Sequence, residues 1–320
     1  MSILAERDKV KTEMEAAKEA QDLDKYNELK TVFDDLNAKA EARKEFVLNE
    51  KKEAKRLLDD GSKYRRDKRW DKAEQSYAGA LGKSDFIDQS IIPSIHLLIG
   101  FCQEQQKKYD SALVSYKTVT ELDPKKAEAF EGMGRVYSKM NMKTESINAY
   151  KKAIELDPEN AKAYFGLATG YYNVNMREDA EKYYAIAVEK DSTYDKAYYQ
   201  LGVVRFKLRK YSEAVAALKK ATEINKRYYL AFTFMAQIYN TTGDYAAAID
   251  AAESSINIKS NYAQSHFEKG IALYHTERYN QALESFKKCL NDRTWREQAE
   301  YHIKLINDKT ANQGLKNSEQ

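Results

Sequence analysis

Residues 161–194 read AKAYFGLATGYYNVNMREDAEKYYAIAVEKDSTY, and the chain repeats the pattern of this stretch every 34 residues. Its first half carries apolar or small side chains on one helical face, at Tyr164, Leu167, Ala168 and Tyr171. After a break at residues 174–176, a second helical stripe runs through Ala180, Tyr184 and Ala187. The stretch therefore predicts a helix, a turn and a second helix.

The repeat is in strict register over most of the chain. Its opening position recurs with no insertion at Pro93, Ala127, Ala161, Asp195, Tyr229 and Ala263. A fixed period of this size is typical of a solenoid, in which small units stack on one another. Such an architecture offers an extended surface rather than a central cleft, so it disfavours an enzyme from the outset.

The conserved spacing within each unit resembles the tetratricopeptide repeat. The third unit matches that pattern at Phe130, Met133, Gly134, Tyr137, Tyr150, Ala153 and Pro158. A divergent first unit matches at Leu57, Gly61, Tyr64, Ala73, Tyr77 and Ala80, and an insertion near residues 84–89 follows it. The sequence departs from the pattern at Gln103, Ser146, Arg205 and Lys269. The resemblance spans 54–293, about three quarters of the chain.

This resemblance implies an all-α, right-handed superhelical solenoid of about seven units. We place the units at 54–87, 93–126, 127–160, 161–194, 195–228, 229–262 and 263–293, and refer to them below as the first to seventh repeats. Because an open end would expose apolar surface, a capping helix is expected over 294–309. A polar, disordered tail is expected over 310–320.

Residues 1–53 lack the repeat and carry two stripes of helical spacing separated by a turn near residues 21–24, with Asp22 or Asp24 as helix cap. They predict a helical hairpin that resembles a coiled coil. Two roles for this arm stay open. It could cap the first repeat, or it could be a docking or self-association arm.

In tetratricopeptide arrays the first helix of each unit lines a concave groove, so the resemblance implies which side chains face a ligand. Three units place aromatic side chains two helical turns apart, as the pairs Phe165 and Tyr172, Tyr199 and Phe206, and Phe267 and Tyr274. Polar groups are expected nearby at Arg135, Lys139, Asn173 and Lys207. Either these rings contact a ligand, or they only pack between helices.

Some members of this family bind chaperone tails through a carboxylate clamp of Lys, Asn and Arg. The corresponding positions here hold Glu131, Arg135 and Lys139 in the third repeat, and Phe165, Thr169 and Asn173 in the fourth. The set does not match, so the sequence disfavours a clamp of that kind.

Composition points away from other classes. The net charge of +3 is too small to favour nucleic acid, and acidic neighbours dilute a basic cluster over residues 63–72. No run is apolar enough to span a bilayer, and no secretory signal is visible at the start of the chain. We expect a cytoplasmic protein, or a periplasmic one if a signal has been removed.

No catalytic or metal-binding motif is present in the sequence. The four histidines, at positions 96, 266, 275 and 302, do not have metal-ligand spacing, and Cys102 and Cys289 lie too far apart to pair. We therefore expect no cofactor. The sequence predicts a non-catalytic scaffold that binds a peptide or helix of a partner protein in its groove. The alternative is a subunit that assembles a larger complex, or that self-associates, through its N-terminal helices, including peripheral association with a membrane complex.

Overall fold

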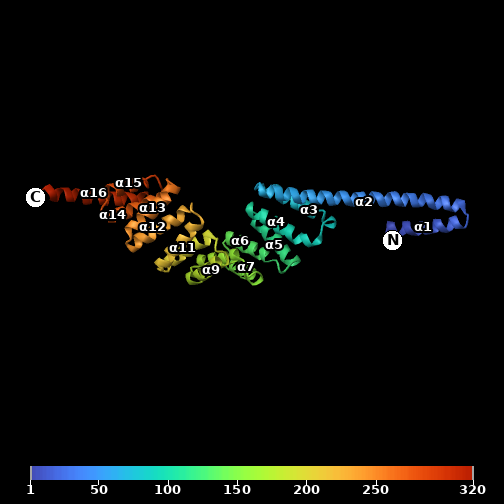
Figure 1. Cartoon of the computed structure of the whole chain (residues 1–320), viewed down its shortest axis with the longest axis horizontal. Coiled ribbons are helices and arrows are strands. Elements are labelled where there is room, and N and C mark those ends of the chain that lie inside the picture. The colour runs from blue at the N-terminus through green and yellow to red at the C-terminus, as the bar shows by residue number, and fades with distance from the viewer. Residues whose placement is uncertain (1, 319–320) are drawn as a thin grey trace. The chain divides into compact units, whose positions relative to one another are not determined.

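The computed structural model describes residues 2–318, which contain helices, turns and loops but no strand. Its contacts divide the chain into two compact units, Met1–Val136 and Tyr137–Gln320, with the boundary inside α6 (Ala127–Lys139). Within each unit, consecutive helices pack as antiparallel neighbours, as Figure 1 shows. The predicted all-α fold of stacked helix pairs is confirmed.

The first unit begins with the arm and continues into the first repeats. Its helices are α1 (Ile3–Glu19), α2 (Leu23–Arg66), α3 (Trp70–Leu81), α4 (Ile92–Gln105) and α5 (Tyr109–Leu122). Two short 3-10 helices, η1 (Ser84–Phe86) and η2 (Gln89–Ile91), fill the insertion that separates the first two repeats.

The second unit carries the remaining repeats. Its complete helices are α7 (Lys143–Leu156), α8 (Ala161–Asn173), α9 (Arg177–Lys190), α10 (Asp195–Lys207), α11 (Tyr211–Ile224), α12 (Tyr229–Thr242), α13 (Tyr245–Ile258), α14 (Ala263–His275), α15 (Tyr279–Lys287) and α16 (Arg296–Ser318).

The arm and the first repeat share one helix. The sequence predicted a boundary at residue 53, but α2 runs without a break for 44 residues from Leu23 to Arg66. Residues 48–60 contain no proline or glycine and are rich in Lys, Glu, Leu and Ala, all of which favour helix. Asp22 caps this helix by accepting a hydrogen bond from the backbone amide of Lys25.

The last helix is also longer than the sequence suggested. Helix α16 continues through residues 310–318, where a disordered tail was expected. No proline interrupts this polar segment, and the helix continues past Gly314. Residues 319–320 of the expected tail lie outside the described part of the chain.

The turn inside every repeat has the same backbone. The residue at position 15 of each repeat has a left-handed backbone conformation in all seven repeats. Only in the sixth repeat is this residue a glycine, Gly243. The other six residues are Lys68, Lys107, Asn141, Asn175, Arg209 and Glu277, with φ between 58° and 65°. After each of them an amide bonds back to a carbonyl of the first helix, such as that of Lys210 to Arg205.

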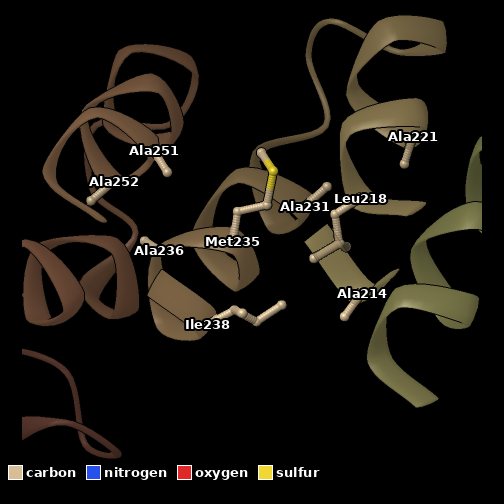
Figure 2. Close-up of a cluster of buried hydrophobic side chains, with 9 residues drawn as sticks. All are labelled: Ala214, Leu218, Ala221, Ala231, Met235, Ala236, Ile238, Ala251 and Ala252. Carbon is tan, nitrogen blue, oxygen red and sulfur yellow. The ribbon is translucent and has the colours of Figure 1, made fainter. Parts of the chain in front are cut away.

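Small residues allow the helices of a repeat to approach closely. A Cβ added at Gly270 in α14 would lie 2.7 Å from the ring of Phe286 in α15. Figure 2 shows the core of the fifth and sixth repeats, where alanines surround Leu218, Met235 and Ile238. This close packing of helix pairs fixes the direction of the side chains that the first helices present.

Candidate partner-binding surface

Helices α8 and α10 present the predicted aromatic pairs at equivalent positions of the fourth and fifth repeats. Phe165 and Tyr172 lie on α8, and Tyr199 and Phe206 lie on α10. All four side chains are half-buried. Seven residues make about two helical turns, so each pair points to one side of its helix.

The first ring of each of these pairs contacts a further aromatic residue of its own repeat. The ring of Phe165 lies 5.1 Å from that of Tyr194, and the ring of Tyr199 lies 5.1 Å from that of Tyr228. Tyr194 and Tyr228 are the residues that close the fourth and fifth repeats, so the contact recurs with the period of the sequence.

Phe234 of α12 extends this arrangement into the sixth repeat. Its ring lies 6.2 Å from Tyr199 and 5.3 Å from Phe206. The contacting rings of the fifth and sixth repeats, and the rings at the equivalent positions of the fourth repeat, together make an aromatic surface. We call this surface the aromatic face and define it as Phe165, Tyr172, Tyr194, Tyr199, Phe206, Tyr228 and Phe234.

The hydroxyls of Tyr199 and Tyr184 are neutral at physiological pH, because the pKa of each is raised. Burial, together with the nearby hydroxyls of Tyr262 and Tyr172, raises the pKa of Tyr199. Burial likewise raises the pKa of Tyr184 to about 12, and its hydroxyl lies 2.9 Å from that of Thr169. Neutral hydroxyls can both donate hydrogen bonds to a peptide and accept them from it.

The polar residues predicted near the aromatic pairs differ in how exposed they are and in which contacts they already make. Lys207 is exposed, and its ammonium lies 5.8 Å from the ring centre of Phe206. Asn173 is exposed at the end of α8, and its carbonyl accepts a hydrogen bond from Lys143. Lys139 is exposed at the last position of α6.

Arg135 is held by carboxylates of its own unit. Its guanidinium donates to Glu104 of the preceding repeat at 3.0 Å and also pairs with Glu131 one turn away. The Glu104 side chain is 8% exposed, and the hydroxyl of Tyr116 donates to it as well. Removing Arg135 would leave these carboxylates uncompensated, so its evident role is structural.

The aromatic pair of the seventh repeat contacts the capping helix. The ring of Phe267 lies 4.7 Å from Trp295 and 5.6 Å from His302. Lys309 of α16 lies over the ring of Tyr274, 5.6 Å from its centre. These contacts account for both rings as packing partners of the C-terminal segment that contains Trp295 and α16.

The sixth repeat replaces rings with a buried polar cluster. The hydroxyl of Thr233 lies 2.8 Å from that of Ser255 and 2.7 Å from that of Ser265, and all three side chains are buried. This threonine occupies the position that holds Phe165 and Tyr199 in the two preceding repeats. The aromatic pairs are interrupted here because a buried threonine, whose hydroxyl has hydrogen-bond partners, stands in place of the ring.

Helix α14 also carries a buried carboxyl group, that of Glu268, which no pattern in the sequence indicated. Burial raises the pKa of Glu268 to about 7, although hydrogen bonds from Asn240 and Gln264 act in the opposite direction. The amide nitrogen of Asn240 donates to a carboxyl oxygen of Glu268 at 2.9 Å. No cation pairs with Glu268 among residues 2–318.

The described residues show no sign of metal or thiol chemistry. Within residues 2–318, His, Cys, Asp and Glu side chains do not gather into a group of three that could hold a metal ion. Burial raises the pKa of Cys102 to about 11 and that of Cys289 to about 12, so neither is a reactive thiolate at neutral pH. No helix in this part of the chain is both long and apolar enough to cross a bilayer.

Comparison with known proteins places the repeats in a family. The family model described as the TPR repeat matches residues 105–141 and 144–174. A second model, described as the TT21 fifth ARM repeats domain, matches residues 195–307. No curated protein matches the chain in sequence.

Several solved structures share the fold at low sequence identity. The C-terminal part of a TPR repeat-containing protein from Cytophaga hutchinsonii is 18% identical, with a TM-score of 0.59 over 75% of this chain and 96% of that one. Pseudomonas aeruginosa pilF is 17% identical, with a TM-score of 0.58 over 66% of this chain and 97% of that one.

A third structure, YrrB, is described as a TPR protein with an unusual peptide-binding site. It is 22% identical, with a TM-score of 0.52 over 58% of this chain and 97% of that one. At these identities the likeness concerns the fold alone. Together, the matched repeat model over residues 105–141 and 144–174, the strict 34-residue period and the shared packing of helix pairs support a protein of the tetratricopeptide repeat family.

Proposed function

We propose that the chain is a non-catalytic scaffold whose aromatic face binds a peptide or helix of a partner protein. Members of the family act in general as protein-interaction scaffolds. The observation that carries the proposal is that half-buried ring contacts recur in the fourth and fifth repeats and extend from Tyr199 and Phe206 to Phe234 of the sixth.

Rings of this kind suit protein recognition for a physical reason. An aromatic side chain offers a large contact area while losing little conformational entropy on binding, and the neutral tyrosine hydroxyls can bond to a peptide backbone. Lys207 lies at the edge of the face and adds a cation next to the apolar surface. In protein interfaces, binding energy concentrates in central aromatic residues that become buried on binding.

The proposal narrows the predicted set of site residues. It retains Phe165, Tyr172, Tyr199, Phe206 and Lys207, with Asn173 at the edge. Arg135 is engaged with Glu104, and the pair Phe267 and Tyr274 packs with α16, so these three are not required to contact a partner.

Photo-crosslinking tests where a partner binds. A benzophenone amino acid placed at Tyr172, which is half-buried on the aromatic face, is expected to crosslink to a partner in cell extract. The same group at Tyr183, whose ring stacks on Tyr171 outside the face, is the matched control. Crosslinks that form equally at both positions, or only at Tyr183, would contradict the proposal.

A further inference from the structure

The N-terminal arm contains a second candidate surface, separate from the aromatic face. Helix α1 folds back along α2, as Figure 1 shows, and its first turn begins only at Ile3. Beyond that point α2 continues without α1 beside it. A pocket of about 510 Å³ opens here, with Ile3 and Leu4 on one side and Val47 and Leu48 on the other. We call it the arm pocket.

The apolar side chains of the arm pocket are unusually exposed. Leu4 is 47% exposed and Leu48 is 52% exposed, and neighbouring Phe46 is 47% exposed. Large apolar side chains clustered in this way are typical of interaction surfaces, because burying them would release about 25 cal/mol for each Å² of apolar area. Since the rims are so open, the pocket suits a macromolecule that lies across it better than a small enclosed ligand.

The charge around the arm pocket is positive. Three cations line it, Arg43, Lys44 and Lys51, and no carboxylate does. Lys44 pairs with Glu41, but both side chains of this pair are more than 60% exposed, so the pair is weak. Among residues 2–311, whose side chains the structure describes, no carboxylate pairs with Lys51.

The spacing of these groups matches a helix. Arg43, Val47 and Lys51 follow one another at intervals of four residues along α2, so the two cations flank the apolar centre about 12 Å apart. A helix that continues the line of α1 along α2 would place its own apolar stripe on Val47 and Leu48. Acidic residues two turns apart on that helix would meet Arg43 and Lys51.

We propose that the arm pocket docks an amphipathic helix of a partner protein, one with an apolar stripe flanked by Asp or Glu. The helix would lie along α2 next to the first turn of α1. This site is formed by elements that do not contribute to the aromatic face, so it is independent of the function proposed above.

Two synthetic helical peptides of about 20 residues test the proposal with the full chain. Both carry the same leucine and alanine stripe, and one has Glu along its flank while the other has Lys. Fluorescence anisotropy should show that the Glu peptide binds at least about tenfold more tightly than the Lys peptide. The double substitution Arg43→Glu and Lys51→Glu should reverse this preference.

Leu48→Asp separates apolar docking from simple charge attraction. It should weaken binding of the Glu peptide by at least about tenfold. Val32→Asp is the matched control, because Val32 is 44% exposed on the same helix but does not line the pocket. Circular dichroism checks that each variant keeps its helix content.

Three results would overturn the proposal. The first is failure of the Glu peptide to bind the wild-type chain at about 1 mM, or equal binding of both peptides. The second is self-association that Leu48→Asp abolishes in light scattering, which would make the occupant a second copy. The third is binding to vesicles of anionic lipid that depends on Leu48 while neither peptide binds, which would make the occupant a membrane surface.

Discussion

Arg205 donates a 3.1 Å hydrogen bond from its guanidinium Nε to Glu181 of the preceding repeat, and Lys210 donates to the same carboxylate at 2.7 Å. Arg205 stands where the repeat pattern usually has tyrosine. The same arrangement recurs between the first and second repeats, where Gln103 and Lys108 of the second repeat both donate to Glu74 of the first. The two departures from the pattern thus form one type of polar contact between repeats.

The substitution Glu181→Gln should destabilise the protein by about 1–3 kcal/mol at neutral pH, because it removes the nearer carboxylate partner of Arg205 and leaves only the more exposed Glu213 at 3.6 Å. Burial by itself would raise the pKa of Glu181, but hydrogen bonds from Lys210 and Arg205 lower it below the ordinary value of 4.5. The contribution is therefore present above that value and is lost as the pH falls through the folded pKa.

Urea denaturation at pH 7 and pH 3 measures this effect. The difference between wild type and Glu181→Gln should shrink at pH 3. Glu223→Gln removes an exposed ion pair on α11 and should leave the free energy of unfolding unchanged at both values. A difference for Glu181→Gln that is the same at pH 7 and pH 3 would contradict this account of the pair.

Glu268 should produce the opposite pH dependence. Its folded pKa of about 7 lies above the ordinary 4.5, so the folded state binds the proton more tightly than the unfolded state. The free energy of unfolding should therefore fall as the pH rises from 4.5 to 7, by about 3 kcal/mol in total. Glu268→Gln should remove this decline and be more stable than wild type at pH 8.

Thermal or urea unfolding across that pH range provides the check. Glu284→Gln, an exposed change on the adjacent helix α15, serves as the control and should keep the wild-type profile. A Glu268→Gln profile that is parallel to wild type would show that this carboxyl does not titrate as its burial requires.

The close approach of paired helices predicts that Gly270→Ala is destabilising. The added methyl group would lie 2.7 Å from the ring of Phe286, which is fully buried and cannot move aside. Overpacking of this kind costs about 1–3 kcal/mol. Gly79→Ala offers a control of opposite sign, because its methyl would meet Leu57 at an ordinary 3.4 Å in an exposed helix and should stabilise by about 0.5–1 kcal/mol. Equal effects of the two changes on the free energy of unfolding would contradict this.

The left-handed backbone of the turns predicts that a glycine at that position increases the stability of the protein. Arg209 has a φ of 60°, a conformation that costs a non-glycine residue about 1–2 kcal/mol. Arg209→Gly should therefore stabilise the protein, by less than that amount because glycine loses more chain entropy on folding. Lys219→Gly, in the middle of α11, should instead destabilise it. Denaturant midpoints distinguish the two, and a loss of stability in Arg209→Gly would refute the interpretation.

Local periodicity was enough to predict the helix pairs, because a buried stripe at helical spacing depends on residues within one repeat. The aromatic pairs Phe165 and Tyr172, and Tyr199 and Phe206, could be found in the same way. The left-handed turn could not, since four of its seven residues, Lys68, Lys107, Arg209 and Glu277, are neither glycine nor asparagine and carry no sequence signature for it.

Contacts between residues that lie far apart in the chain could not be predicted from sequence patterns. Arg135 was expected to face a ligand, but its environment depends on Glu104, which lies 31 residues earlier in another repeat. Phe267 was placed with the other aromatic pairs because its packing against Trp295 depends on how α16 docks. Glu268 occupies a polar position of its helix in sequence, and only the packing of α12 and α14 shows that it is buried.

The affinity of a recovered partner for aromatic-face variants tests the central claim most directly. Isothermal titration calorimetry would compare wild type, the triple variant Phe165→Ala, Tyr199→Ala and Phe206→Ala, and a control with Tyr164→Ala and Tyr183→Ala, which removes stacked rings outside the face. The account predicts that the triple variant keeps its helix content and binds at least about a hundredfold more weakly, while the control binds like wild type. Unchanged affinity in a folded triple variant would contradict it.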